Sequence, residues 1–197
     1  MVKKNLIGAD YLLLLLHLND REPIKGSTRL TKMMFLFNEE IAPLLKNINK
    51  DKLPDFFPFD YGPFSKDLYE QIELFKNIKF IKLTNMNSME DMDEADDWEE
   101  SPYIDELYQQ ELYINEKEIN SFFKNIDGKF IKYSIAPLGN NFVEHDIKPH
   151  IIQEQLELLR KFKSKITTIP IKQLLYYVYS KYPEYTEKSK IKEDVLG

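Results

Sequence analysis

The pattern of apolar and polar positions predicts a mainly helical chain with a few short strands. Residues 9–19 contain five consecutive leucines, and a helix that is apolar nearly all round is expected to be buried between other elements. A second helix is expected to begin at Ser27 or Thr28, either of which can cap its N-terminus. Pro43 is expected to end or kink this helix. Its apolar positions recur at helical spacing: Leu30, Met33, Met34, Phe37 and Ile41.

In the middle of the chain, the pattern predicts one helix followed by segments of strand. The helix is expected to start at the turn over residues 60–63, with the proline of that turn at its first position. Strands are expected over residues 80–84, 103–114 and 130–136, the last because apolar side chains alternate along it. A short helix is expected over residues 115–128.

The predicted elements indicate one domain of 197 residues. Residues 1–84 form a helical core, residues 85–102 an acidic loop insertion, residues 103–136 strands and a short helix, and residues 137–197 C-terminal helices. We therefore expect an α+β fold that is mainly helical, with a winged-helix-like core and a small antiparallel sheet. The C-terminal helices are expected to pack back on that core.

Charge changes this picture, because the net charge of -6 is very unevenly distributed. Residues 1–89 carry 13 basic and 11 acidic residues, and residues 107–197 carry 14 basic and 12 acidic residues. Residues 90–106, which we call the acidic run, carry ten acidic residues and no basic one. The chain outside the acidic run is therefore mildly basic, which permits contact with a nucleic acid without requiring it.

The acidic run has three interpretations. It is a solvated loop between strands, a docking surface for a basic protein, or a mimic of a nucleic-acid backbone that occupies a basic face. The only tryptophan, Trp98, lies within the run and could anchor an interface. The candidate partner-binding residues are Glu90, Asp91, Asp93, Glu94, Asp96, Asp97, Trp98, Glu99 and Glu100.

Motifs that carry catalysis are missing from the sequence. The chain has no cysteine, which excludes disulfides, thiolate metal sites and cysteine nucleophiles. It has no glycine-rich phosphate loop, no G-x-S-x-G and no H-E-x-x-H. Glu144, His145, Asp146 and His150 could be imagined as a metal cluster, but Pro149 separates the histidines and favours surface or capping roles.

The D-x-K triplets at residues 127–129 and 146–148 leave a metal-dependent nuclease as a distant third possibility. We expect no enzyme activity, no cofactor and no metal.

A set of basic and hydroxyl side chains could contact DNA. If the second and third helices pack as a variant of the helix-turn-helix, Arg29, Lys32, Ser65 and Lys66 would meet one phosphate backbone. Lys129 and Lys132 would add contacts from the strand side. The alternative is that the turn at residues 60–63 only directs the chain into the third helix.

Two segments resemble a known family. Residues 28–36 (TRLTKMMFL) and 59–68 (FDYGPFSKDL) are similar to a paired motif of the Panacea (SocA-like) antitoxin family and of YwgA-like prokaryotic proteins. Residues 174–183 are similar to the end of YwgA-like members. The motif positions are Arg29, Leu30, Lys32, Tyr61, Gly62, Pro63, Phe64 and Ser65. The resemblance implies an α-rich antitoxin or adaptor, and the acidic run departs from the family pattern.

These observations favour a non-enzymatic regulator or antitoxin-like adaptor that binds another protein, such as a toxin or other basic protein. The alternative is a winged-helix-like transcriptional regulator that binds DNA. We expect a cytoplasmic protein with no membrane contact, because the longest apolar run is far shorter than the ~18 residues that span a bilayer.

Overall fold

The computed structural model describes residues 5–85 and 131–197. In this part of the chain the fold is α+β and mainly helical, with a small antiparallel sheet, as the sequence predicts. The α-helices are α1 (Gly8–Arg21), α2 (Ser27–Leu36), α3 (Lys66–Asn77), α6 (Pro137–Phe142), α7 (Gln153–Thr168), α8 (Ile171–Lys181) and α9 (Lys192–Leu196). The strands are β1 (Ile24–Lys25), β2 (Phe57–Phe59), β3 (Gly62–Phe64), β4 (Ile81–Asn85) and β5 (Ile131–Ile135).

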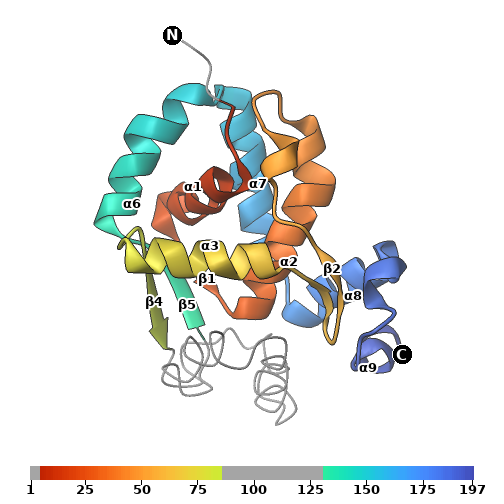
Figure 1. Cartoon of the computed structure of the whole chain (residues 1–197). Helices are drawn as coiled ribbons and strands as arrows, with labels where there is room; N and C mark the ends of the chain where they lie inside the picture. The colour runs from red at the N-terminus through yellow and green to blue at the C-terminus, as the bar shows by residue number, and fades with distance from the viewer. Residues whose placement is uncertain (1–4, 86–130) are drawn as a thin grey trace.

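Helix α1 is the centre of the molecule. Leu12, Leu13, Leu14, Leu15 and Leu16 are all fully buried. In Figure 1 this helix lies in the middle, with α2, α3, α6 and α7 around it, and it packs against α7 and β5. The prediction of a helix buried on every side is confirmed, because five adjacent leucines leave it no polar face.

Helices α2 and α6 end in the same way. Each continues into a π-helical turn, η1 (Phe37–Ile41) or η7 (Val143–Ile147), and then into a 3₁₀ turn, η2 (Ala42–Leu44) or η8 (Lys148–His150). Pro43 and Pro149 lie within these 3₁₀ turns. A proline ring clashes with the carbonyl four residues earlier and donates no hydrogen bond, so the helix widens and stops. The predicted effect of Pro43 is confirmed.

The larger sheet has the strand order β1-β5-β4, and every pair is antiparallel. Its inward face carries Ile24, Ile81, Ile131 and Tyr133, which are buried. The last residue of β4, Asn85, is paired with Ile131 at the start of β5. The chain therefore leaves the sheet at Asn85 and rejoins it at Ile131, at the same end of β4 and β5. The expected strand at 103–114 and helix at 115–128 lie outside the described residues. The winged-helix-like core was expected to include that strand, and it stays a prediction.

The C-terminal segment packs around the short β2–β3 hairpin. After α8 it contains a 3₁₀ turn, η9 (Pro183–Thr186), and the short helix α9. The Tyr179 hydroxyl lies 2.9 Å from the Ser189 hydroxyl, and Lys190 pairs with Asp60 in the hairpin turn. The C-terminal residues thus pack back on the core, as expected.

None of the helices within residues 5–85 and 131–197 is long and apolar enough to cross a membrane.

Candidate functional site

Arg29, the first cation of the paired motif, is buried between two helices. Its side chain is only 3% exposed. The guanidinium Nη1 donates hydrogen bonds to the carbonyl oxygens of Ile166 (2.8 Å) and Ile169 (2.6 Å) at the C-terminal end of α7. The expectation that Arg29 faces solvent and contacts DNA is wrong. A cation at a helix C-terminus satisfies free carbonyls and meets the negative end of the helix dipole.

Lys32, the second cation of the motif, is equally buried, with 3% of its side chain exposed. Its ammonium Nζ donates to the carbonyl oxygens of Tyr61 (2.6 Å) and Pro63 (3.1 Å). These two carbonyls flank Gly62 in the β2–β3 hairpin. The two halves of the paired motif therefore meet in space, and Lys32 holds the hairpin against α2. Its predicted role as a DNA contact on a solvent-facing side is wrong as well.

The turn at residues 60–63 closes a β-hairpin and does not begin a helix. Phe59 pairs with Gly62, and Pro63 lies within β3. Helix α3 starts at Lys66, with the Ser65 hydroxyl accepting a hydrogen bond from the Leu68 amide at 3.2 Å. The prediction of Pro63 at the first helical position is therefore wrong. Ser65 is fully buried as the cap, so it is not an exposed phosphate contact either.

Gly62 is required where the hairpin meets α8. Its φ is +82°, and a Cβ placed on it would lie 2.9 Å from Cε1 of Tyr179. We expect Gly62→Ala to lower the free energy of unfolding by about 1–3 kcal/mol, because a left-handed φ and a steric overlap both oppose the methyl group. Urea unfolding followed by circular dichroism measures this. Gly197→Ala is the control, since its site has a similar φ but no atom within 4 Å. An unchanged stability of Gly62→Ala would contradict the packing described.

The remaining predicted DNA contacts are scattered. Lys66 is exposed and lies 3.4 Å from Glu70 one turn along α3, and Lys132 lies on β5 with its side chain partly exposed. Lys129 lies outside the described residues. DNA binding keeps only Lys66 and Lys132 among its described contacts, and it stays a prediction. The whole candidate partner-binding set at 90–100 also lies outside the described residues.

A third buried cation, Lys163, was not singled out from the sequence. It is fully buried on α7, and its Nζ donates to the carbonyl oxygens of Leu18 (2.7 Å) and Glu22 (2.6 Å). Between these carbonyls, Asn19, Asp20 and Arg21 have φ values of 55°, 55° and 64°. A left-handed turn of three non-glycine residues costs about 1–2 kcal/mol per residue, so Lys163 binds both ends of a strained turn. Burial lowers the pKa of Lys163 to about 8, although the nearby Glu22 carboxylate opposes this effect.

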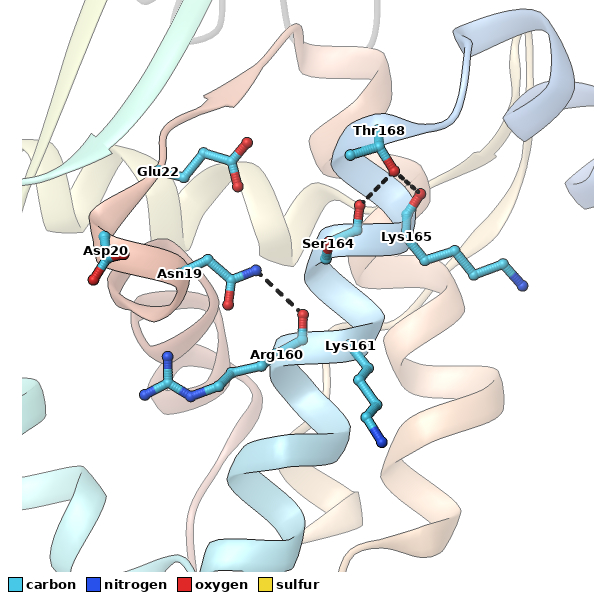
Figure 2. A pocket seen from close by; sticks show the side chains of 8 residues that line it. All are labelled: Asn19, Asp20, Glu22, Arg160, Lys161, Ser164, Lys165 and Thr168. Atoms are coloured by element: carbon cyan, nitrogen blue, oxygen red, sulfur yellow. Dashed lines mark hydrogen bonds between the residues drawn. The ribbon is translucent and has the colours of Figure 1, made fainter.

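The same turn forms one wall of an open groove of about 740 Å³, and the outer face of α7 forms the other (Figure 2). Figure 2 shows Glu22 directed into the gap, while Lys161 and Lys165 extend from α7 away from the turn. Small-molecule sites are mostly lined by hydrophobic and aromatic side chains, and this groove is lined only by polar and charged residues, so we assign it no ligand. Its lining residues are Asn19, Asp20, Glu22, Arg160, Lys161, Ser164, Lys165 and Thr168.

A polar cluster around Glu40 joins the end of α2 to the tyrosine-rich end of α8. Glu40 Oε1 accepts hydrogen bonds from Tyr177 Oη (2.7 Å), Lys181 Nζ (2.9 Å) and Tyr182 Oη (3.0 Å). Burial opposes ionisation of Glu40, but these three donors hold the pKa of its carboxyl below the usual value. The tyrosine hydroxyls thus serve a contact between helices, and the sequence offered no signal that Glu40 would be their acceptor.

The side chains of His17 and His145 have separate partners. His17 Nε2 lies 3.1 Å from Glu144 Oε1, and His17 Nδ1 lies 3.0 Å from Asn140 Oδ1, so this ring joins α1 to α6 and η7. His145 lies against the carbonyl of Asn141, one turn earlier in its own helix. Within residues 5–85 and 131–197, no group of three or more histidine, aspartate or glutamate side chains could hold a metal ion.

Comparisons of this chain with protein-family models, with curated proteins and with solved structures found no match.

Proposed function

We propose that this protein is a non-enzymatic regulator or antitoxin-like adaptor that acts by binding a basic protein, and that it works in the cytoplasm. The acidic run is the binding element in this proposal. Trp98 supplies an apolar anchor among the carboxylates, since aromatic side chains carry much of the energy of protein interfaces. The run would attract a basic partner over a distance and raise its rate of association.

The observation that carries the proposal is the place at which the segment containing the acidic run is attached to the sheet. Ten carboxylates fall within 17 residues, and they belong to the segment that joins Asn85 to Ile131. These two residues are paired in the sheet, so both ends of the segment are anchored at the same end of β4 and β5. A partner that bound the run would therefore be tethered to the folded body at that end of the sheet.

The buried positions of the motif residues Arg29 and Lys32 also support the proposal that the protein is an adaptor. Arg29 and Lys32 bind main-chain carbonyls of α7 and of the hairpin, so the motif stabilises the scaffold. A scaffold of this kind can present an inserted segment without taking part in chemistry.

The test is affinity capture of partners by the intact protein and by a variant in which five of the ten acidic residues of the run are neutralised. The variant carries Asp93→Asn, Glu94→Gln, Asp96→Asn, Asp97→Asn and Glu99→Gln. We expect the wild type to retain a basic protein and the variant to lose it, with binding of the purified pair falling steeply as salt is raised.

A variant of equal charge change serves as the control. It carries Asp51→Asn, Asp146→Asn, Glu154→Gln, Glu157→Gln and Glu193→Gln, all on exposed positions of the described structure. It should retain the partner as the wild type does. If the wild type and the neutralised variant retain the same proteins, or if the wild type retains none, the proposal is wrong.

A further inference from the structure

The outward face of the three-stranded sheet carries a lysine on every strand. Side chains of paired residues point to the same face of a sheet. Lys25 of β1 pairs with Lys132 of β5, which pairs with Thr84 of β4, and Lys82 of β4 pairs with Ser134. The neighbouring pairs that contain Ile24, Tyr133, Ile81 and Ile135 face the core. We call Lys25, Lys82 and Lys132 the lysine face.

The register of the lysine face places like charges together. Lys25 and Lys132 are directly opposite each other, where Cβ atoms lie about 4.5–5.5 Å apart, and Lys82 is a diagonal neighbour of Lys132 at about 7–8 Å. Like charges directly opposite each other on adjacent strands are destabilising. The ammonium groups of Lys82 and Lys132 would both attract an anionic group bound over this face.

Thr84 gives an independent sign that this face is covered. Its hydroxyl is buried and has no hydrogen-bond partner, although Thr84 lies beside Lys132 on the outward side of an edge strand. Buried hydroxyls normally have a partner. A polar group placed over the face would supply one.

The acidic run is tethered within reach of the lysine face. Its first carboxylate, Glu90, comes five residues after Asn85, and five extended residues span at most about 17 Å. Lys82 and Lys132 lie within about 10 Å of Asn85, since a strand rises about 3.4 Å per residue and neighbouring strands lie about 4.8 Å apart. A segment joined to the site by a short link has a high effective concentration there.

We propose that the lysine face is the docking site of the chain's own acidic run. Carboxylates of residues 90–106 bind the ammonium groups of Lys25, Lys82 and Lys132 in the absence of a partner. This inference goes beyond the proposed function, because it concerns the isolated chain. A basic partner would compete with the lysine face for the same carboxylates.

The test is quenching of Trp98 fluorescence by acrylamide, a neutral quencher, in the full-length protein. Trp98 is the only tryptophan, so its signal reports on the acidic run alone. We compare the wild type with the variant Lys25→Gln, Lys82→Gln and Lys132→Gln. At about 10 mM salt, where charges act over about 30 Å, we expect a quenching constant at least two-fold smaller in the wild type. In about 1 M salt, where this range falls to about 3 Å, the two should agree.

The control variant is Lys50→Gln, Lys161→Gln and Lys188→Gln, which removes equal charge from exposed positions away from the sheet. It should behave as the wild type does, and circular dichroism checks that each variant is folded. Equal quenching constants of wild type and lysine-face variant at low salt overturn the proposal. A wild-type quenching constant that does not change with salt concentration overturns it as well. A DNA duplex bound by the wild type but not by that variant, with equal quenching of both, would assign the face to nucleic acid instead.

These outcomes separate the two proposals. A docked run with no captured partner would refute only the proposed function. A captured partner with salt-independent quenching would refute only the docking.

Discussion

Arg29→Met is expected to lower the free energy of unfolding by about 1.5–3 kcal/mol, the contribution of a buried hydrogen bond from a charged donor. The carbonyl oxygens of Ile166 and Ile169 lose their donor, and buried acceptors without a partner are costly. Arg29→Lys should fall between the wild type and Arg29→Met, because an ammonium keeps the charge but not the planar fork. Urea unfolding followed by far-ultraviolet circular dichroism measures all three proteins.

The matched control is Lys66→Met, at an exposed position of α3 where Lys66 pairs only with Glu70. We expect it to change stability by less than about 0.5 kcal/mol. If Arg29→Met lowered the free energy of unfolding no more than Lys66→Met does, the motif arginine would not hold α2 to α7. The DNA contact that the sequence predicts for Arg29 would then regain support.

Lys163→Met is expected to lower the free energy of unfolding at pH 7 by about 1–3 kcal/mol. Methionine fills a similar volume but donates no hydrogen bond to the carbonyls of Leu18 and Glu22, and unpaired buried acceptors cost energy of this order. The left-handed turn at Asn19, Asp20 and Arg21 also loses the group that joins its two ends.

The effect of Lys163→Met should depend on pH with a definite sign. The pKa of Lys163 is about 8 in the folded protein and about 10.4 when unfolded. Between these values the unfolded chain binds more protons, so the contribution of Lys163 to stability increases as the pH rises. The wild type should therefore gain stability relative to Lys163→Met from about pH 8 to pH 10, and unfolding curves at several pH values measure the difference. A constant difference would show that the ammonium is not buried as described.

Local patterns predicted the elements whose burial depends on their own sequence. The leucines of α1 and the apolar stripe of α2 are buried as predicted, and so are Ile131 and Tyr133 in the alternating pattern of β5, whereas Ile135 is only partly buried. The apolar stripe of α3 at Leu68, Ile72 and Phe75 is buried too. These features depend only on apolar residues that repeat every 3.6 residues in a helix or every 2 in a strand, and residues close together in the chain specify such a repeat.

The β2–β3 hairpin shows where local rules compete. Proline is favoured at the first position of a helix, so the sequence predicts Pro63 there. Ser65, two residues later, is an equally ordinary N-cap, and it is the residue that begins α3. The alternation of Phe57, Phe59 and Phe64 around a turn was the signal for the strands. Tertiary contacts favour that alternative, because Lys32 binds the hairpin carbonyls and Tyr179 packs on Gly62.

The sequence alone predicts the class of the fold, the central helix and the concentration of charge at residues 90–106. The partners of the buried cations depend on tertiary packing. Lysine and arginine are almost never fully buried without partners, and here the partners are carbonyls far away in the chain: 137 and 140 residues from Arg29, and 145 and 141 residues from Lys163. Every residue has a main-chain carbonyl, so the residue types do not show which carbonyl accepts a hydrogen bond from a buried cation. Which carbonyls meet which cation follows only from how the helices pack.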